Sequence, residues 1–376
     1  MNLYKTGSII LMLLIVACKS NIKNEPKSDN SRFNDVKLKY AKGFKISTSD
    51  KFIKLIVENP WQKAQNVSFE YLLSNDTARL RNTIQIPVRN VVCLSTTHVA
   101  YICAVDEHKS ILGLTNPTMV SDTVIQNQIL LGITNDIGNE QALNYETILS
   151  LNPDVIFAYG VGAEVQSVYQ KFAEWGIPVV IVSEYLEELP LAKTEWIKFF
   201  SCFYDKANLA DSLFNSIELQ YTDWADKAKN IEQKPIIMSS LPWKGVWYVP
   251  GGESFMANFI NDAGGNYQFK REKARESLNL SIEEVMLEGQ KANLWIHTGM
   301  ANSLNDILAS DDRLAQLPAF KNGQVYNNNK RQNIYGGNDF WESGVMNPHL
   351  VLKDLIHIFH PQLYSDTSFY YYQKLN

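Results

Sequence analysis

The sequence predicts an α/β protein with two lobes, each built on a central, mainly parallel sheet, joined by one long α-helix and preceded by a small β-rich segment. Three observations favour this fold. Short apolar runs alternate with helical stretches in both halves of the chain, a pattern typical of parallel sheets covered by helices. Between them, residues 191–234 contain neither glycine nor proline and repeat apolar residues at helical spacing. The segment before residue 90 alternates with period two instead.

The first 17 residues are predicted to be a signal peptide. A basic residue precedes the apolar run Ile9–Ala17, which is too short to span a bilayer but suits the core of a secretory signal. The run ends in "IVAC", which resembles the lipobox of bacterial lipoproteins. This resemblance implies that Cys18 is lipidated and becomes the mature N-terminus. The alternative is an ordinary signal in which a small residue happens to precede a cysteine.

Residues 18–32 hold too little apolar surface to form a core and are predicted to be a flexible tether. No later run is long and apolar enough to span a membrane, so the lipid is the only expected anchor.

Composition narrows the function classes. The net charge is −5 and basic residues are not concentrated on any long stretch, so nucleic-acid binding is not expected. Besides Cys18 the chain has Cys93, Cys103 and Cys202. A Cys93–Cys103 bridge is possible in an exported protein, but these cysteines also suit small apolar positions in packed elements.

The elements follow in order. Residues 33–89 should form a few antiparallel strands, as an N-terminal extension. Residues 90–205 form the first lobe, with a helix over 163–175 and strands in "VVCLS", "ILGLT", "VIFAY" and "VVIVS". The linking helix is predicted over 206–230, with Asp205 as a possible cap. At 1.5 Å per residue it would be roughly 37 Å long.

The second lobe is predicted over 231–362 and a tail over 363–376. Helices are expected at about 254–262 and 348–359, and strands in "PIIMSS", "GVWYV", "LWIHT" and "QVY".

One small unit occurs twice. "NYETILSLNPDVIFAYG" (144–160) and "SIEEVMLEGQKANLWIHTG" (281–299) each read as a short helix, a break, an apolar strand and a glycine. Each carries a glutamate near the helix start, Glu146 and Glu283. The simplest explanation is that the helix dipole favours an acid there.

Together with "WYVPGGESFMANFINDAGGNY" and "DFWESGVMNPHLVLKDLIHIFHP", these units resemble the substrate-binding lipoproteins of ATP-binding-cassette importers, in the family that captures iron–siderophores and cobalamin. The resemblance covers about residues 91–361. It implies a monomeric binding protein that is not an enzyme, faces the periplasm on a lipid anchor, and delivers its ligand to a permease and ATPase. It also implies that Glu146 and Glu283 dock against the transporter, one acid for each permease subunit. The second unit is two residues longer, so neighbouring Glu284 is an alternative to Glu283.

In open α/β sheets, ligands bind beyond the carboxyl ends of the strands. These ends and the late loop "NKRQNIYGGNDFW" supply aromatic and polar side chains suited to an iron chelate or corrinoid, with no separate cofactor. The predicted ligand-binding residues are Thr97, His98, Tyr159, Gly160, Tyr185, Trp243, Trp247, Thr298, Arg331, Tyr335 and Trp341.

Two further features bear on the ligand. The basic run Phe269–Arg275 is a candidate contact for an anionic siderophore, although such runs are usually solvated loops. The Gly251-Gly252 turn before a helix could cradle an anion, and a tight turn alone explains it equally well.

Other functions have weaker support. Related lipoproteins bind bare zinc or manganese through three histidines and a carboxylate, but only His98 and His297 fall at strand ends, so no metal site is expected. The sequence has no motif of a hydrolase, a P-loop or a zinc protease, and no catalytic residues are assigned. A surface lipoprotein that binds a polymer or partner through its N-terminal extension is a third alternative.

Overall fold

The computed structural model describes residues 33–76, 83–162, 165–363 and 368–376. The signal peptide, Cys18 and the tether lie outside the described residues. The N-terminal extension forms a five-stranded sheet of order β1-β2-β3-β4-β5, antiparallel except for the last pair. This confirms the period-two prediction. The strands are β1 (Asn34–Val36), β2 (Phe44–Thr48), β3 (Phe52–Glu58), β4 (Ser68–Ser74) and β5 (Ile84–Gln85).

The first lobe is a parallel sheet of order β12-β11-β6-β7-β8. The four predicted apolar runs supply β6, β7, β11 and β12, which are almost wholly buried. The elements, in chain order, are β6 (Val91–Cys93), α1 (Thr96–Ala104), β7 (Ile111–Leu114), α2 (Thr123–Leu130), β8 (Asn135–Asp136), α3 (Tyr145–Ser150), β11 (Val155–Ala158), α4 (Val165–Glu174) and β12 (Val179–Ile181). A short antiparallel pair, β9 (Gly138–Asn139) and β10 (Ala142–Leu143), precedes α3.

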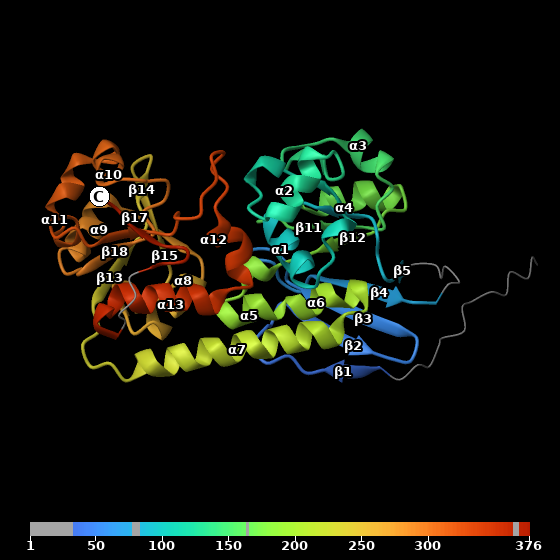
Figure 1. Cartoon of the computed structure of the whole chain (residues 1–376), viewed down its shortest axis with the longest axis horizontal. Helices are drawn as coiled ribbons and strands as arrows, with labels where there is room; N and C mark the ends of the chain where they lie inside the picture. Colours follow the sequence, from blue (N-terminus) through green and yellow to red (C-terminus); the bar gives the residue numbers. More distant parts are fainter. Residues whose placement is uncertain (1–32, 77–82, 163–164, 364–367) are drawn as a thin grey trace, which may run out of the picture. The chain divides into compact units, whose positions relative to one another are not determined.

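Three helices lead out of the first lobe: α5 (Pro190–Glu195), α6 (Ile197–Ser201) and α7 (Ala207–Lys229). The 23-residue α7 is the predicted long helix, and it packs against α5 and α6 and against α8 and α13 of the second lobe. In Figure 1, α13, α5 and α6 lie one after another along α7. Asp205 does not cap α7. It adopts a left-handed conformation with φ 55°, and Lys206 stands at the N-cap without a side-chain hydrogen bond.

The second lobe has a sheet of order β16-β13-β18-β19-β20, parallel except for the last pair. Its main elements are β13 (Ile236–Ser239), α8 (Phe255–Asp262), β16 (Asn266–Tyr267), α9 (Ile282–Gly289), β18 (Leu294–Ile296), α10 (Leu304–Ser310), α11 (Pro318–Lys321), β19 (Val325–Asn327), α12 (Asp339–Glu342), α13 (Pro348–Phe359) and β20 (Gln373–Lys374). The predicted strand "GVWYV" is real but lies outside this sheet. It forms β15 (Val246–Pro250), which pairs with β14 (Pro242–Trp243) and β17 (Ser277–Ser281) in a small antiparallel sheet.

Two buried carboxylates hold segments at opposite ends of the described chain. Glu195 on α5 accepts hydrogen bonds from the backbone N–H groups of residues 39–41 at 2.7–3.1 Å. Asp354 on α13 accepts those of residues 370–372 at 2.6–3.2 Å. The predicted tail is therefore part of the second lobe, where Tyr371 and Tyr372 are fully buried.

The largest cluster of buried apolar side chains extends across the molecule. One cluster of buried side chains runs from Phe44 in the extension through Phe157 and Phe200 to Phe214 on α7 and Ile237 in the second lobe. Each lobe adds a smaller cluster of its own. Among the described residues, no helix is both long and apolar enough to cross a membrane.

Candidate functional site

The carboxyl ends of neighbouring strands in the second sheet present exposed aromatic side chains. Trp243 follows β13 and is 61% exposed, while Tyr335 and Trp341 follow β19 and are 63% and 52% exposed. Met300 follows β18, between them, and is 81% exposed. Because β13, β18 and β19 are adjacent and parallel, the segments that follow them leave the sheet at one edge. Trp243 lies on β14, and Trp341 lies on α12 after the loop that carries Tyr335.

The first lobe contributes a tyrosine pair at the corresponding edge. Tyr159 follows β11 and Tyr185 follows β12, and their ring centroids lie 6.5 Å apart. The Tyr185 hydroxyl donates to the Gly160 carbonyl at 2.8 Å, and the Tyr159 hydroxyl donates to Glu140. Burial and the nearby Glu140 carboxylate raise the pKa of Tyr159, so its hydroxyl stays protonated.

Thr97, at the start of α1, is half-buried. Its hydroxyl donates to the buried Glu184 carboxylate at 2.7 Å. Burial raises the pKa of Glu184, although the Thr97 bond and the nearby Lys193 oppose the rise. The polar group of Thr97 is thus used within the first lobe.

Three predicted ligand-binding residues are core residues instead. His98 is completely buried among Phe157, Tyr159 and Phe200. Trp247 is completely buried against Trp295 and donates its indole N–H to Ser239 at 3.2 Å. Thr298 is fully buried as well. These positions lie at or near strand ends, but their side chains face inward, so they cannot touch a ligand in this structure.

Arg331 is exposed but already engaged. Its Nε bonds to Asp339 Oδ2 at 2.5 Å, and its guanidinium lies 4.6 Å from the centre of the Tyr370 ring. Arg331 therefore fixes the late loop that carries Tyr335 and Trp341.

That loop is held against the first lobe. Asn333 Nδ2 donates to the carbonyls of Thr118 at 2.9 Å and Val120 at 3.2 Å. Gly337 permits this approach, because a Cβ there would meet the Met119 carbonyl oxygen at 2.1 Å.

A second contact between the lobes lies close by. Glu342 on α12 accepts hydrogen bonds from the backbone N–H groups of Ser121 at 2.7 Å and Asp122 at 2.8 Å. Burial raises the pKa of the Glu342 carboxyl to about 7, even though these two bonds favour the ionised form.

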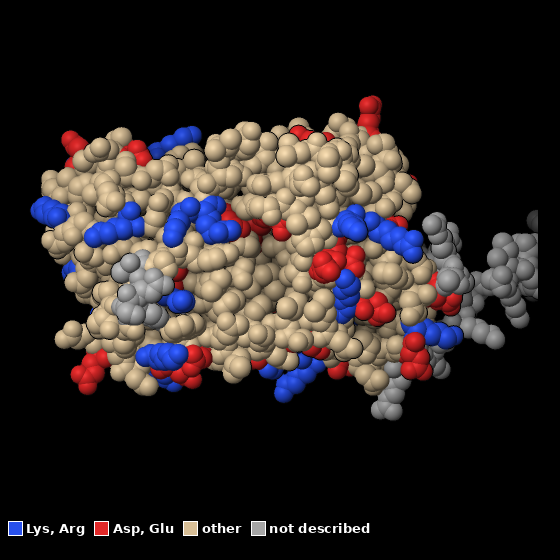
Figure 2. Space-filling view, viewed as in Figure 1, with Lys and Arg blue, Asp and Glu red and all other residues tan. Residues whose placement is uncertain are grey.

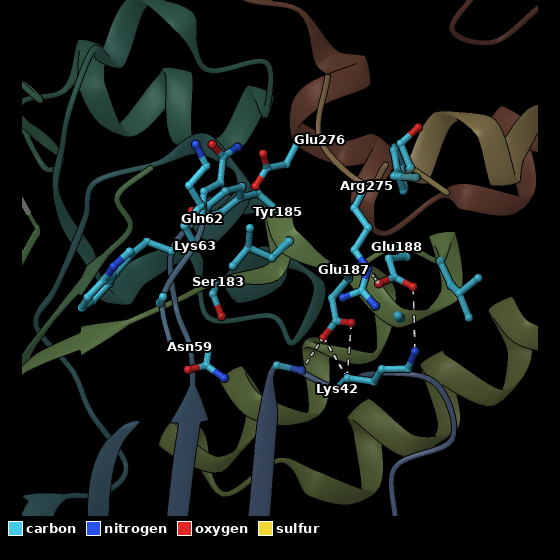
Figure 3. A pocket seen from close by; sticks show the side chains of 18 of the residues that line it. Lys42, Asn59, Gln62, Lys63, Ser183, Tyr185, Glu187, Glu188, Arg275 and Glu276 are labelled. Carbon is cyan, nitrogen blue, oxygen red and sulfur yellow. Dashed lines mark hydrogen bonds and ion pairs between the residues drawn. The ribbon is translucent and has the colours of Figure 1, made fainter. Parts of the chain in front are cut away.

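A cavity of about 500 Å³ is lined by residues from three parts of the chain. Of the residues predicted to bind the ligand, only Tyr185 is among those that line this cavity. Figure 3 shows the labelled side chains: Lys42, Asn59, Gln62 and Lys63 of the extension, Ser183, Tyr185, Glu187 and Glu188 of the first lobe, and Arg275 and Glu276 of the second lobe. The extension is thus part of a wall of the cavity.

Charges in this cavity are largely paired. Arg275 Nε lies 2.5 Å from Glu188 Oε1, and Lys42 Nζ lies 3.8 Å from the other oxygen of Glu188 (Figure 3). Glu187 accepts from the backbone N–H groups of Lys42 and Gly43 and from the Trp196 indole. Burial raises the pKa of Glu187, and these hydrogen bonds oppose it.

The basic run reaches the cavity only through Arg275. Lys270 and Arg271 line a separate surface cavity of about 520 Å³. On the face shown in Figure 2, Lys and Arg side chains stand in small groups among acidic ones rather than in a broad basic patch.

The Gly251-Gly252 turn is not an anion cradle. The two N–H groups donate to the carbonyls of Glu276 at 3.1 Å and Glu272 at 3.0 Å. The glycines are needed because a Cβ at either position would lie 2.3–2.5 Å from the carbonyl oxygens of the 272–276 loop.

The two glutamates of the repeated unit occupy the same place. Glu146 is the second residue of α3, after the N-cap Asn144, and Glu283 is the second residue of α9, after the N-cap Ser281. Both are exposed. Glu284 completes a capping box with Ser281, with bonds of 2.9 and 3.2 Å. The structural equivalent of Glu146 is therefore Glu283 and not Glu284.

Among the described residues, neither histidine at a strand end lies in a group of three possible metal ligands. Burial lowers the pKa of both His98 and His297 to about 3. His297 hydrogen-bonds to the Tyr372 hydroxyl and packs against Phe340. It serves the second-lobe core. The three cysteines among the described residues are free thiols, so Cys93 and Cys103 do not form a disulfide in this structure.

Comparison with known proteins identifies the family. Residues 91–331 match the profile described as periplasmic binding protein. An uncharacterized lipoprotein of Methanocaldococcus jannaschii is 27% identical over 302 residues, which cover 78% of this chain and 70% of the relative.

Solved structures share the fold. A periplasmic heme-binding protein from Pseudomonas aeruginosa matches with a TM-score of 0.60 at 13% identity, covering 77% of this chain and 98% of that protein. The periplasmic vitamin B12 binding protein of Vibrio cholerae matches with a TM-score of 0.54 at 16% identity, covering 74% and 98%. Since the family profile spans well over half of its length, the chain belongs to the periplasmic binding protein family, which consists of solute-binding proteins rather than enzymes.

Proposed function

We propose that this protein is the lipid-anchored binding component of an ABC importer, and that it captures a large metal chelate between its lobes. The ligand class is an iron–siderophore or a cobalamin-like corrinoid. The observation that carries the proposal is the exposure of Trp243, Tyr335 and Trp341, at 61%, 63% and 52%, on segments that follow one edge of the second sheet. Exposed aromatic side chains concentrated at one edge are typical of a binding surface for a large, partly apolar ligand.

The opposite edge supports the same ligand class. Tyr159 and Tyr185 add aromatic surface with hydroxyl groups, and the cavity beside Tyr185 adds polar side chains from the extension. Because Arg275 is paired with Glu188, this cavity does not select for an anionic ligand. Solved structures with this fold include binding proteins for heme and vitamin B12 and a protein of an Fe3+-hydroxamate transport system, and this supports a chelate as the ligand.

The ligand is tested by tryptophan fluorescence. The protein is titrated with a ferric hydroxamate, a ferric catecholate, cyanocobalamin and hemin, and with the iron-free siderophores as controls. We expect saturable, one-to-one binding of one of these chelates. Trp341→Ala and Trp243→Ala should each weaken it by about 10-fold or more, because a buried aromatic contact of this kind is worth more than ~1.4 kcal/mol.

Trp175→Ala is the matched control. Trp175 is also exposed, at 42%, but it packs against Tyr145 and Phe172 beyond α4. Its loss should leave affinity unchanged. The proposal fails if the chain binds none of the chelates, or if the Trp341 and Trp243 variants bind as tightly as the control.

The lipid anchor is a separate part of the proposal. Cys18→Ala should release the protein from membranes while leaving ligand binding intact, because no helix among the described residues is long and apolar enough to cross a membrane. Membrane fractions washed with high salt give the readout. Continued pelleting of the variant would disprove the lipid anchor without affecting the ligand assignment.

A further inference from the structure

Three side chains of different chemistry meet on the first lobe, apart from the aromatic edges. They are the Cys103 thiol near the end of α1, the His108 imidazole before β7, and the Asp122 carboxylate at the N-cap of α2. One ligand atom of each lies within 4.8 Å of the others, and all three residues are half-buried. We propose that Cys103, His108 and Asp122 form a binding site for a divalent transition-metal ion of the zinc class.

The distance between His108 and Asp122 suits two ligands of one ion better than a direct hydrogen bond. His108 Nε2 lies 3.7 Å from Asp122 Oδ2, which is too far for a hydrogen bond. Two ligands of one tetrahedral zinc ion, with bonds of about 2.0–2.2 Å, lie roughly 3.3–3.5 Å apart. A shift of a few tenths of an ångström would therefore bring these two atoms to coordination distance.

The carboxylate is already oriented. Asp122 Oδ1 accepts the backbone N–H groups of Val124 and Ile125, both at 2.9 Å. These bonds fix the carboxylate and leave Oδ2 directed to His108. Behind the imidazole, Asp106 Oδ1 lies 3.9 Å from His108 Nδ1. This is beyond hydrogen-bond distance, so Asp106 adds negative charge beside the site but does not fix the orientation of the imidazole.

The donor set defines the ion. Thiolate, imidazole and carboxylate together suit Zn2+ and Co2+, whereas Mg2+ and Ca2+ prefer oxygen ligands alone. Three protein ligands leave one tetrahedral position for water or a small anion.

The site is linked to the contact between the lobes. Asp122 donates its backbone N–H to Glu342 of the second lobe at 2.8 Å, and the neighbouring Ser121 does so at 2.7 Å. An ion that holds the Asp122 side chain would also fix the backbone that Glu342 binds. The ion would therefore stiffen the first-lobe side of this contact, and it is not the transported ligand.

Cobalt titration tests the site directly. The full chain, freed of metal by chelator, is titrated with Co2+ alone and followed by absorption. We expect one ion per chain, with the d–d bands of a tetrahedral centre and a thiolate-to-cobalt charge-transfer band, both abolished by Zn2+. The melting temperature should rise with Zn2+.

Matched variants assign the ligands. Cys103→Ser should remove the charge-transfer band. Asp122→Asn should weaken binding by roughly 10-fold or more, and it leaves α2 capped because asparagine is an equally good N-cap. Asp106→Asn should weaken binding less. Cys202→Ser, which alters a buried thiol elsewhere, should change nothing.

The outcomes are decisive in both directions. Absence of a charge-transfer band in the wild-type chain, or its persistence in Cys103→Ser, would overturn the proposal. Chelate binding should survive Cys103→Ser, so failure of this site and failure of the proposed transport function are separately visible.

Discussion

Both lobes contain the same helix–strand unit, but the glutamate at the start of its helix has different neighbours in each lobe. In the first lobe, α3 leads to β11, and Glu146 has no ion-pair partner among the described residues. In the second lobe, α9 leads to β18, and Glu283 is paired with Arg313 at 2.9 Å. Arg313 lies between α10 and α11, in a connection of three helical segments that the first lobe replaces by the single helix α4. The backbone is repeated, but the side-chain partners are not.

The same contrast holds for a buried histidine. His98 in the first lobe makes no hydrogen bond with either ring nitrogen within the described chain, although the Phe157 carbonyl lies near enough to oppose the fall in its pKa. His297 in the second lobe bonds to Tyr372, which comes from the C-terminal segment. The second lobe thus owes its additional polar contacts to segments that the first lobe lacks.

The largest expected effect comes from removing both acids. If Glu146 and Glu283 dock on the importer, Glu146→Ala/Glu283→Ala should lower transport, or ATPase stimulation in a reconstituted importer, by at least about 10-fold. Ligand affinity and melting temperature should hardly change, because both side chains are exposed. Normal transport by a normally expressed double variant would disprove docking through these residues.

The two buried histidines should contribute differently to the loss of stability at acid pH. Burial holds the folded pKa of each at about 3, below an unfolded value of about 6.5. Their stabilisation is therefore present above about pH 6.5 and is lost as pH falls, by about 2 kcal/mol for His98 between pH 7 and pH 5. His297 keeps some exposed surface, so its share should be smaller.

Phenylalanine at each position tests this contrast. His98→Phe should relieve the loss at pH 5 and cost little at pH 7, since no hydrogen bond is removed. His297→Phe should cost about 1–3 kcal/mol at pH 7, because the buried Tyr372 hydroxyl loses its partner. The free energy of unfolding, measured with urea at pH 7 and pH 5, tests both expectations.

Glu342 and other buried acids change stability with the opposite sign, so each variant must be compared with the wild type at the same pH. If His98→Phe and His297→Phe lower the free energy of unfolding equally at pH 7, the proposed difference between the two histidines is wrong.

Arg313→Ala should have a smaller effect and of the opposite kind. The substitution removes the ion pair of Glu283, so that Glu283, like Glu146, has no basic partner among the described residues. We expect unchanged folding, because the pair is exposed, and a modest gain in affinity for the importer that is strongest at low salt. Glu146→Ala alone provides the reference, since it should weaken docking at every salt concentration. A weaker docking in Arg313→Ala would mean that Arg313 itself contacts the transporter.

The smallest expected change is in the relative position of the lobes. Because α7 packs along elements of both lobes and the apolar core is continuous, the lobes should move little on binding. X-ray scattering curves with and without ligand should nearly superimpose. A clear contraction would show that the lobes close on the ligand despite the contacts of Asn333 and Glu342 between them.

Much of the fold was predictable because its elements have strong local patterns. The last helix was placed at 348–359 and is Pro348–Phe359, and the long helix was expected over 206–230 and is Ala207–Lys229. Both carry apolar residues at regular helical spacing. The strand "GVWYV" was correctly identified, but its sheet was not, since a strand pattern does not name its partners.

The site was predicted only in part. The strand-end rule located Trp243, Tyr335 and Trp341 on an exposed edge, but it does not tell which side chains turn inward, as those of His98, Trp247 and Thr298 do. The contribution of the extension was missed entirely. Lys42 and Gly43 are held by Glu187, about 145 residues away along the chain, and no local pattern signals a contact at that separation.

The continuous core has a thermodynamic consequence. Because buried side chains connect the extension, both lobes and α7 without a break, the lobes are not independently melting units. Calorimetry should show one heat-absorption peak with equal calorimetric and van't Hoff enthalpies. Exchanging one lobe with that of a relative would cut through Phe200, Phe214 and Ile237 together, so specificity in this protein is more readily altered by replacing loops than by recombining lobes.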